Sequence, residues 1–220
     1  MSKAWVQAAI DVQDIDLAKQ IAFMALDAGA EWLEVGTPLL YQYGHEAIGM
    51  LRRSVGKAVK LVADYKSPFA TLCAEQAARQ GADFVMLSIG YNDWALEKNF
   101  ADCRAAGIEP IFDLAVRQDD LYPTIRKLVA RGGKYMFSRH YSTDLQADGT
   151  LVKSDNMSLL VQKPKDYLLG ITSDDFDEMC DAVALGADWI TFGYILRNPN
   201  AVSCKRWVDA VHQQTRNANL

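Results

Sequence analysis

Gly29-Ala-Glu-Trp32, Gly81-Ala-Asp-Phe84 and Gly186-Ala-Asp-Trp189 are three versions of one short sequence, and they decide the fold. Each follows a helical pattern and runs into a short apolar stretch, which is typical of a helix, a glycine that ends it, and a buried strand. Glycines that end helical stretches recur at positions 29, 56, 81, 107 and 132, which are 27, 25, 26 and 25 residues apart by subtraction. Position 186 follows 54 residues later, about two more units. The sequence therefore predicts repeated strand–helix units.

Short apolar runs between turn-forming residues are predicted to be strands. They lie near residues 5–10, 32–35, 59–63, 84–88, 108–112, 134–138, 167–171 and 189–192. Their apolarity is continuous, which is typical of strands buried on both faces and hence of a parallel sheet. Helical patterns separate them, for example Leu17 to Ala28 and Asp93 to Ala106. Ser67-Pro68 is predicted to begin the third helical region, as an N-cap followed by a proline in the first turn.

Eight strand–helix units at this spacing predict an α/β fold, a single (β/α)8 TIM barrel domain over residues 1–220. An open doubly wound sheet is the alternative. It is less favoured because eight strands are predicted and no G-x-G-x-x-G follows the first one. No linker or low-complexity segment suggests a second domain.

The composition narrows the class of protein. The formal net charge is -5 and no run of Lys and Arg occurs, which argues against a nucleic-acid or membrane surface. No apolar run approaches the length of a membrane span, and the N-terminus lacks the form of a signal peptide. The cysteines have no metal-binding spacing and are interpreted as reduced core thiols; they are Cys73, Cys103, Cys180 and Cys204. We expect a cytoplasmic protein.

Acidic residues stand where several predicted strands end. They are Asp11, Glu34, Asp64 and Asp113, and Lys66 follows the third of them by two residues. In a (β/α)8 barrel the carboxyl ends of the strands and the loops after them form the active face. These side chains are therefore predicted to face one mouth. His140 follows strand six and is also placed there, whereas His45 and His212 fall in helical regions.

Several carboxylates in one mouth repel one another. Some must be protonated, paired with Lys66 or bound to a cation. Oxygen ligands without a His/Cys set favour Mg²⁺ over zinc. A cation beside an ammonium group can stabilise the two adjacent oxygens of an enediolate, with the cation as a Lewis acid and the lysine offsetting charge or moving a proton. The alternative is a salt-bridge network that only closes the mouth of the barrel.

Four motifs in order resemble one known family. They are Ala9-Ile-Asp11, Glu34-Val-Gly36-Thr37, Asp64-x-Lys66 and His140-x-x-x-Asp144-Leu-Gln146-Ala-x-Gly149. With these motifs the chain resembles the orotidine-monophosphate-decarboxylase-like barrels over nearly its whole length. The resemblance is strongest to the branch that holds 3-keto-L-gulonate-6-phosphate decarboxylase and hexulose-6-phosphate synthase.

The resemblance implies a Mg²⁺-dependent carbon–carbon lyase of the decarboxylase or aldolase type. Its substrate would be a keto-sugar or keto-sugar acid, related to sugar phosphates, that reacts through a cis-enediolate. In family terms Glu34 and Asp64 would bind the metal. Asp11 and Lys66 would contact substrate hydroxyls and the enediolate oxygen, and His140 would deliver or remove a proton.

The resemblance also implies a substrate-binding set and a partner. The substrate-binding residues would be Asp113, Thr143, Thr172 and Arg197. Asp113 matches the synthase type, because the gulonate decarboxylase type usually carries Glu at that position. The family is dimeric with its active sites at the subunit interface, so a homodimer is expected.

The chain departs from the family pattern at several positions. The family motif D-x-K-x-x-D ends here in Phe69 instead of an acid that enters the partner's site, and the decarboxylase-type Arg is replaced by Thr143. The phosphate-binding Gly-Gly and Gly-Arg turns are replaced by Thr172-Ser173-Asp174-Asp175 and Gly193-Tyr194, with Arg197 near enough to compensate in part. Acids at a helix start bond its amides and repel a phosphate, although Ser173 to Asp175 also fit an ordinary helix cap.

Three functional hypotheses remain. An active lyase or isomerase is favoured because the acids, Lys66 and His140 are retained. A non-catalytic, binding descendant is the alternative, supported by Phe69 and by the loss of the phosphate turns. An epimerase or aldolase with Lys66 as a Schiff base is disfavoured, because Asp64 keeps the lysine charged. The sequence leaves open the substrate and the choice between decarboxylation and aldol chemistry.

Overall fold

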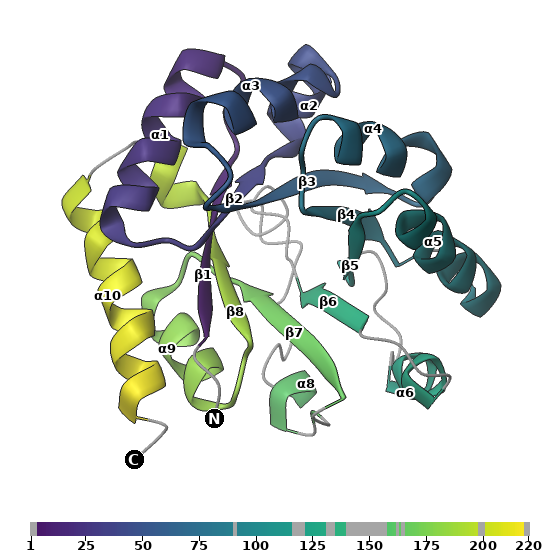
Figure 1. The fold of residues 1–220 in the computed structure, drawn as a ribbon. Coiled ribbons are helices and arrows are strands. Elements are labelled where there is room, and N and C mark those ends of the chain that lie inside the picture. Colours follow the sequence, from purple (N-terminus) through teal and green to yellow (C-terminus); the bar gives the residue numbers. More distant parts are fainter. Residues whose placement is uncertain are drawn as a thin grey trace, which may run out of the picture.

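A computed structural model of the chain describes residues 4–89, 92–115, 122–130, 135–139, 158–161, 163, 166–197 and 201–217. Within these residues, eight parallel strands close into a barrel in sequence order, and helices surround it (Figure 1). The predicted (β/α)8 barrel is therefore confirmed. Gly132, expected to end a helix, lies outside the described residues.

The strands agree with the predicted runs in number and order. They are β1 (Trp5–Ile10), β2 (Trp32–Val35), β3 (Lys60–Ser67), β4 (Phe84–Ser88), β5 (Glu109–Asp113), β6 (Tyr135–Arg139), β7 (Tyr167–Thr172) and β8 (Trp189–Phe192). The helical elements are α1 (Ile15–Ala28), α2 (Thr37–Tyr43), α3 (Glu46–Val55), η1 (Ala70–Leu72), α4 (Ala74–Arg79), α5 (Asp93–Ala105), α6 (Tyr122–Ala130), α8 (Ser158–Val161), α9 (Phe176–Ala184), η2 (Tyr194–Arg197) and α10 (Ala201–Asn217). The main difference is β3, which continues four residues beyond the predicted Ala63.

Large apolar side chains fill the barrel below its mouth. This inner cluster consists of Trp32, Val62, Met86, Ile111, Met136 and Trp189. β7 has a glycine beside the Trp189 ring, because a Cβ on Gly170 would stand 1.9 Å from the Trp189 side chain. The lower part of the barrel is thus filled with apolar side chains, so we expect the chemistry at the opposite, carboxyl end of the strands.

The repeated Gly-Ala-acid sequence ties neighbouring strands together at their amino ends. Each acid forms two hydrogen bonds with one residue of the preceding strand. Its side chain accepts from the backbone N–H of that residue, and its own backbone N–H donates to the carbonyl of that residue. The pairs are Glu31 with Val6, Asp83 with Leu61, and Asp188 with Leu169. Each acid also faces a basic side chain, namely His212, Arg52 with Lys60, and Lys163 respectively. The repeat therefore has a structural role, far from the mouth.

The prediction that Ser67-Pro68 begins the third helix is wrong. Ser67 is the last residue of β3, η1 begins at Ala70, and α4 begins at Ala74. The side chain of Asn99 on α5 holds this segment in a turn: its Nδ2 donates to the Pro68 carbonyl at 2.8 Å, and its Oδ1 accepts from the Ala70 N–H at 3.0 Å. Ser67 does accept locally from the Phe69 N–H at 3.1 Å, but the Ala70 N–H is satisfied by Asn99, which is distant in sequence.

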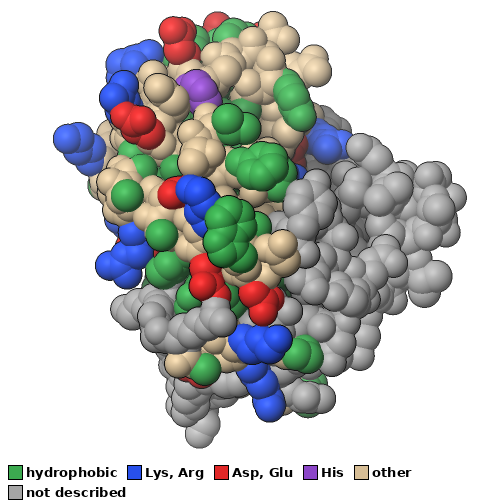
Figure 2. Space-filling view, turned by 90° about the vertical axis from the view of Figure 1, so that its right-hand side faces the viewer, with side chains coloured by type: hydrophobic (Ala, Val, Ile, Leu, Met, Phe, Trp, Pro, Cys, Tyr) green, Lys and Arg blue, Asp and Glu red, His purple; other side chains and the backbone are tan. Residues whose placement is uncertain are grey.

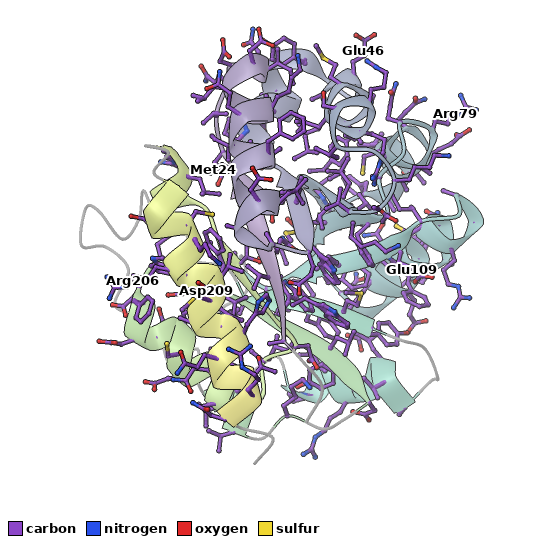
Figure 3. The ribbon with its side chains drawn as sticks, turned by 60° about the vertical axis from the view of Figure 1, so that its left-hand side comes forward. Met24, Glu46, Arg79, Glu109, Arg206 and Asp209 are labelled. Atoms are coloured by element: carbon purple, nitrogen blue, oxygen red, sulfur yellow. The ribbon has the colours of Figure 1, made fainter. Side chains whose placement is uncertain are left out.

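The last helix closes the barrel against its neighbour. Arg206 extends from α10 toward α9 (Figure 3), where its guanidinium lies 4.9 Å from the centre of the Phe176 ring. Trp207 packs edge-on against the same ring at 5.6 Å and contacts Phe192 of β8 at 5.8 Å. These contacts fix α9 and β8, whose loops border the mouth.

Two further features bear on the class of protein. The four cysteines are free thiols, as expected, and three of them are buried. Among the described residues, no helix combines the length and the apolarity that crossing a bilayer requires.

Candidate active site

Lys66 stands at the mouth between two buried carboxylates. Its Nζ lies 2.6 Å from Asp64 Oδ2 and 3.6 Å from Asp113 Oδ2. Burial alone would lower the pKa of Lys66, but the charges of Asp64, Asp113 and Glu34 raise it well above its usual value. The lysine is therefore a fixed positive charge at neutral pH, partly exposed at the end of β3.

The backbone at Lys66 is distorted in a way that turns this side chain. Among the described residues, Lys66 is the only non-glycine with a positive φ, at 48°. The pairing of β3 with β4 shifts between Asp64 and Ser67, so the strand bulges there. The hydroxyl of Ser88, at the end of β4, donates to the Lys66 carbonyl at 2.6 Å. A strained residue held by a neighbouring strand is typical of a functional position.

Asp64 is held from one side and lacks a partner on the other. The hydroxyl of Thr37 lies 2.9 Å from Asp64 Oδ2 and 3.0 Å from its carbonyl. Oδ2 also receives the Lys66 ammonium. Oδ1 is buried and has no hydrogen-bond partner within the described part of the chain. A buried carboxylate oxygen without a donor requires one from a ligand, a water molecule or a cation.

Glu34 lies inside the barrel, hydrogen-bonded to Gln7 of β1. Gln7 Nε2 donates to Glu34 Oε2, and both side chains are buried. Burial and the charges of Asp64 and Asp11 raise the pKa of Glu34 well above its usual value, against the opposing effects of Lys66 and Gln7. Burial and the neighbouring acids therefore shift this carboxyl toward its protonated form relative to an exposed glutamate.

Asp11 packs against the ends of two neighbouring strands. A Cβ on Gly36 would stand 2.2 Å from Asp11 Oδ1 and 2.6 Å from the Ile10 carbonyl, so only glycine fits there. A Cβ on Gly193, after β8, would stand 3.2 Å from Asp11 Oδ2. The glycine of the Glu34-Val-Gly36-Thr37 motif thus allows β1 and β2 to bring their acids together.

The pKa of Asp11 is about 6, because burial and the negative charge of Asp64 raise it. The positive charges of Lys66 and Arg197 lower it in part, and Asp174 raises it further. Asp11 therefore exchanges a proton within the physiological range, and both Arg197 and Asp174 act on the mouth.

Asp113 has similar chemistry on the other side of Lys66. Burial raises its pKa to about 6, although Lys66 and the N–H of Ala115 favour the charged form. Ala115 donates to Asp113 Oδ1 at 2.8 Å. Asp11 and Asp113, two acids of raised pKa, thus interact electrostatically with a lysine of raised pKa, which is typical of sites that handle protons.

The structure brings the predicted acids and Lys66 into one interacting group, since the charges of Asp11, Glu34, Asp64 and Asp113 act on one another or on Lys66. Thr172 ends β7, and Arg197 ends η2. His140 and Thr143 lie outside the described residues, so their predicted roles stay predictions.

Sequence reasoning assigned no role to three residues that hold this group. Gln7 bonds Glu34, Thr37 bonds Asp64, and Ser88 bonds the Lys66 carbonyl. Gln7 and Ser88 did carry a signal. Residues 7, 9 and 11 face the same side of β1, so Gln7 in this buried run points to the same side as Asp11. Ser88 is a polar residue at the end of an otherwise apolar strand.

The turn after β7 was interpreted as two acids at the start of one helix, and half of this is correct. Asp175 is the N-cap of α9 and accepts from the N–H groups of Asp177 and Glu178. Asp174 instead crosses to β8, where its Oδ1 accepts from the Gly193 N–H at 3.1 Å. The two acids therefore bond amides in two different loops.

The donor set fits a divalent cation only in part. No group of three His, Cys, Asp or Glu side chains in the described residues is arranged as a ready-made metal site. Mg²⁺, however, commonly binds through one or two carboxylates and completes its shell with water and substrate oxygens. Among the described residues, Asp64 has a buried oxygen without a hydrogen-bond partner and Glu34 has a raised pKa, so a cation could bind at these two carboxylates.

No family model matches the chain, and no curated protein matches it. Solved structures do share its fold. 3-Hexulose-6-phosphate synthase from Salmonella typhimurium has a TM-score of 0.83 at 22% identity, over 96% of this chain and 99% of that one. 3-Keto-L-gulonate-6-phosphate decarboxylase from Vibrio cholerae has a TM-score of 0.75 at 20% identity, over 98% and 99%. Orotidine 5'-phosphate decarboxylase from Pyrococcus horikoshii has a TM-score of 0.67 at 18% identity, over 96% and 99%.

These structures belong to the branches that the four sequence motifs resemble. The likeness extends over almost the full length of each chain, so the shared feature is the whole barrel.

Proposed function

We propose that the chain is a Mg²⁺-dependent carbon–carbon lyase that acts on a keto-sugar or keto-sugar acid through a cis-enediolate. The observation that carries this proposal is the Lys66 ammonium between Asp64 and Asp113, next to the unpartnered Asp64 Oδ1. The names of the similar structures, a synthase and two decarboxylases of phosphorylated compounds, support the same kind of chemistry.

Each residue has a role that follows from its surroundings. Lys66 stays protonated and offsets the negative charge that develops on the enediolate oxygen. Asp64 and Asp113 keep it charged and in place. Asp11, with a pKa of about 6, accepts a hydrogen bond from a substrate hydroxyl or takes up a proton. His140 lies outside the described residues, and the exchange of a proton with the substrate carbon is proposed for it from the sequence resemblance alone.

A divalent cation, when bound by Glu34 and Asp64, would supply Lewis-acid stabilisation to the adjacent oxygens of the substrate. Gln7 and Thr37 would orient these two carboxylates, since each donates a hydrogen bond to one of them.

The first test of the function is hydrogen exchange. Wild-type protein with Mg²⁺ in D₂O is incubated with ketopentoses and 3-keto-sugar acids, both free and phosphorylated. Deuterium incorporation is followed by NMR, together with CO₂ release and formaldehyde consumption. We expect exchange into at least one compound, because an enediolate takes a proton from solvent. If none exchanges or reacts, the non-catalytic alternative replaces the lyase.

Metal binding gives a test that needs no substrate. We expect wild-type protein to bind one Mn²⁺, a Mg²⁺ substitute with a paramagnetic signal, and Glu34→Gln or Asp64→Asn to weaken this about 10-fold or more. The exposed Asp16→Asn is the matched control and should bind as wild type does. Binding by both site variants at wild-type affinity would show that the metal, if any, is held elsewhere.

A binding protein without catalysis is the second candidate, because Phe69 stands where the resemblance expects an acid and Asp174 occupies the Gly193 amide. A Schiff-base aldolase is less favoured. Such a lysine needs a lowered pKa, whereas the surrounding acids raise that of Lys66.

We also propose that the protein forms a homodimer through the edge of the mouth at η1 and α5. Phe69, Leu72 and Trp94 are exposed by 51%, 67% and 70% in the single chain. Figure 2 views the side that carries α4 and α5 and shows several hydrophobic side chains at its surface. Asn99 ties the segment before η1 to α5, so these apolar side chains belong to one supported surface.

We expect a dimer at micromolar concentration in analytical ultracentrifugation. Leu72→Lys should raise the dissociation constant about tenfold or more, since burying an apolar side chain of this size contributes ~1.5 kcal/mol or more. Tyr41→Lys is the control, because Tyr41 is 88% exposed on α2. A wild-type monomer, or equal effects of both variants, would contradict this interface.

A further inference from the structure

Asp174 ties the turn after β7 to the end of β8. Its Oδ1 accepts a hydrogen bond from the backbone N–H of Gly193, 3.1 Å away, and Gly193 is the first residue after β8. Beside it, the Ser173 N–H donates to the Thr191 carbonyl at 3.0 Å. The amide at the start of the β8 loop therefore already has a carboxylate as its partner.

Three more amides of this corner are bonded within the chain, those of Asp175, Asp177 and Glu178. Asp175 Oδ1 accepts from the N–H groups of Asp177 and Glu178 at the start of α9, each at 3.0 Å. The N–H of Asp175 donates to the Ser173 hydroxyl at 3.1 Å. In (β/α)8 enzymes the loops after strands seven and eight frequently bind phosphate through such amides. A phosphate here would have to displace two carboxylates and would be repelled by their charge.

The same carboxylate borders the substrate mouth. The charge of Asp174 acts on Asp11, and both side chains lie against Gly193. Carboxylates accept several hydrogen bonds and repel anions, so this wall favours a group that donates hydrogen bonds. Arg197 brings a positive charge to the same corner and lowers the pKa of Asp11, but Asp174 and Asp175 still hold the amides.

We propose that Asp174 sets the substrate class: the far end of the keto-sugar or keto-sugar acid is a free hydroxyl and not a phosphate ester. This proposal rests on the enediolate lyase function and names the end of its substrate that lies away from the reacting carbons. The similar structures are named for phosphorylated compounds, so Asp174 marks a change of substrate within a shared barrel.

The first experiment uses inorganic phosphate as the probe and needs no substrate. The ¹⁵N–¹H resonance of Gly193 is followed during a phosphate titration without Mg²⁺. We expect no specific shift in wild type up to ~50 mM phosphate. In Asp174→Gly we expect a saturable shift, with a dissociation constant for phosphate at least tenfold below that limit. Asp174→Asn retains a side-chain oxygen for the Gly193 N–H and should lie between the two. Asp181→Asn, on the exposed side of α9, is the control and should match wild type.

Two results of this titration would overturn the proposal. One is a wild-type Gly193 resonance that saturates at low millimolar phosphate. The other is that neither Asp174 variant binds phosphate more tightly than wild type, which would mean that Asp174 does not prevent an anion from binding at this corner.

The second experiment compares D-ribulose with D-ribulose 5-phosphate in the D₂O exchange assay. We expect wild type to exchange the free sugar at least tenfold faster at equal subsaturating concentration, and Asp174→Asn to reduce this ratio several-fold. A wild-type preference for the phosphate ester overturns the Asp174 proposal and leaves the lyase function in place. If neither compound nor any other keto-sugar exchanges, the lyase function fails, and the Gly193 titration alone decides the role of Asp174.

Discussion

Lys66→Ala is expected to lower kcat by about 10²-fold or more for any substrate that the wild type turns over, the size typical of a lost electrostatic stabiliser. The ammonium lies 2.6 Å from Asp64 and 3.6 Å from Asp113, and its removal leaves both carboxylates without their common partner. The developing enediolate would then lose the ammonium that offsets its charge, while the carboxylates of Asp64 and Asp113 remain beside it. The measurement is the rate of turnover and of deuterium incorporation from D₂O at saturating substrate.

Two comparisons make this result specific. Lys98→Ala removes a lysine from an exposed ion pair on α5 and should keep the rate within about twofold. His140→Asn should slow exchange of the carbon-bound hydrogen more than it weakens binding, because a histidine near its pKa moves protons. Wild-type rates in both Lys66→Ala and His140→Asn would refute the assignment of roles.

Arg52→Met is expected to lower the free energy of unfolding by about 3 kcal/mol, equivalent to a fall in Tm of roughly 6–12 °C for a domain of this size. Arg52 on α3 donates to the carbonyls of Gly56, Val59 and Gly81 at 2.6, 2.9 and 2.8 Å. It also lies 2.6 Å from Asp83, and its side chain is 12% exposed. Methionine fills the volume but leaves these oxygens without donors.

The control is Arg53→Met, one residue along on the exposed face of the same helix, which should change Tm by about 1 °C or less. pH supplies a second check. Burial opposes the charged form of Asp83, but Lys60, the N–H of Leu61 and Arg52 lower its pKa overall. Its contribution is therefore present above the ordinary carboxyl range and lost as pH falls through the lowered pKa. The difference between wild type and Arg52→Met should shrink below about pH 4. A difference that is constant with pH would exclude Asp83 as the partner that matters.

The barrel was predictable because its signals are local and repeated. Continuous apolar runs identify strands that are buried on both faces, and glycines with positive φ at positions 29, 81 and 186 end the helices before them. The acids at the strand ends were predictable for a related reason. In a barrel of parallel strands all carboxyl ends meet at one mouth, so sequence position alone places Asp11, Glu34, Asp64 and Asp113 together.

The sequence by itself determined the number and order of the strands and which charged residues share the mouth, because both follow from short-range patterns and from the geometry of a closed sheet. Only the tertiary structure decided how those residues are held. The bulge and positive φ at Lys66 depend on the pairing of β3 with β4 and on Ser88. The turn that replaces the expected helix at Ser67 depends on Asn99, and the crossing of Asp174 to Gly193 depends on two loops that meet in space. Each of these features depends on a hydrogen bond between groups about 19 to 31 residues apart along the chain, so no local propensity specifies it.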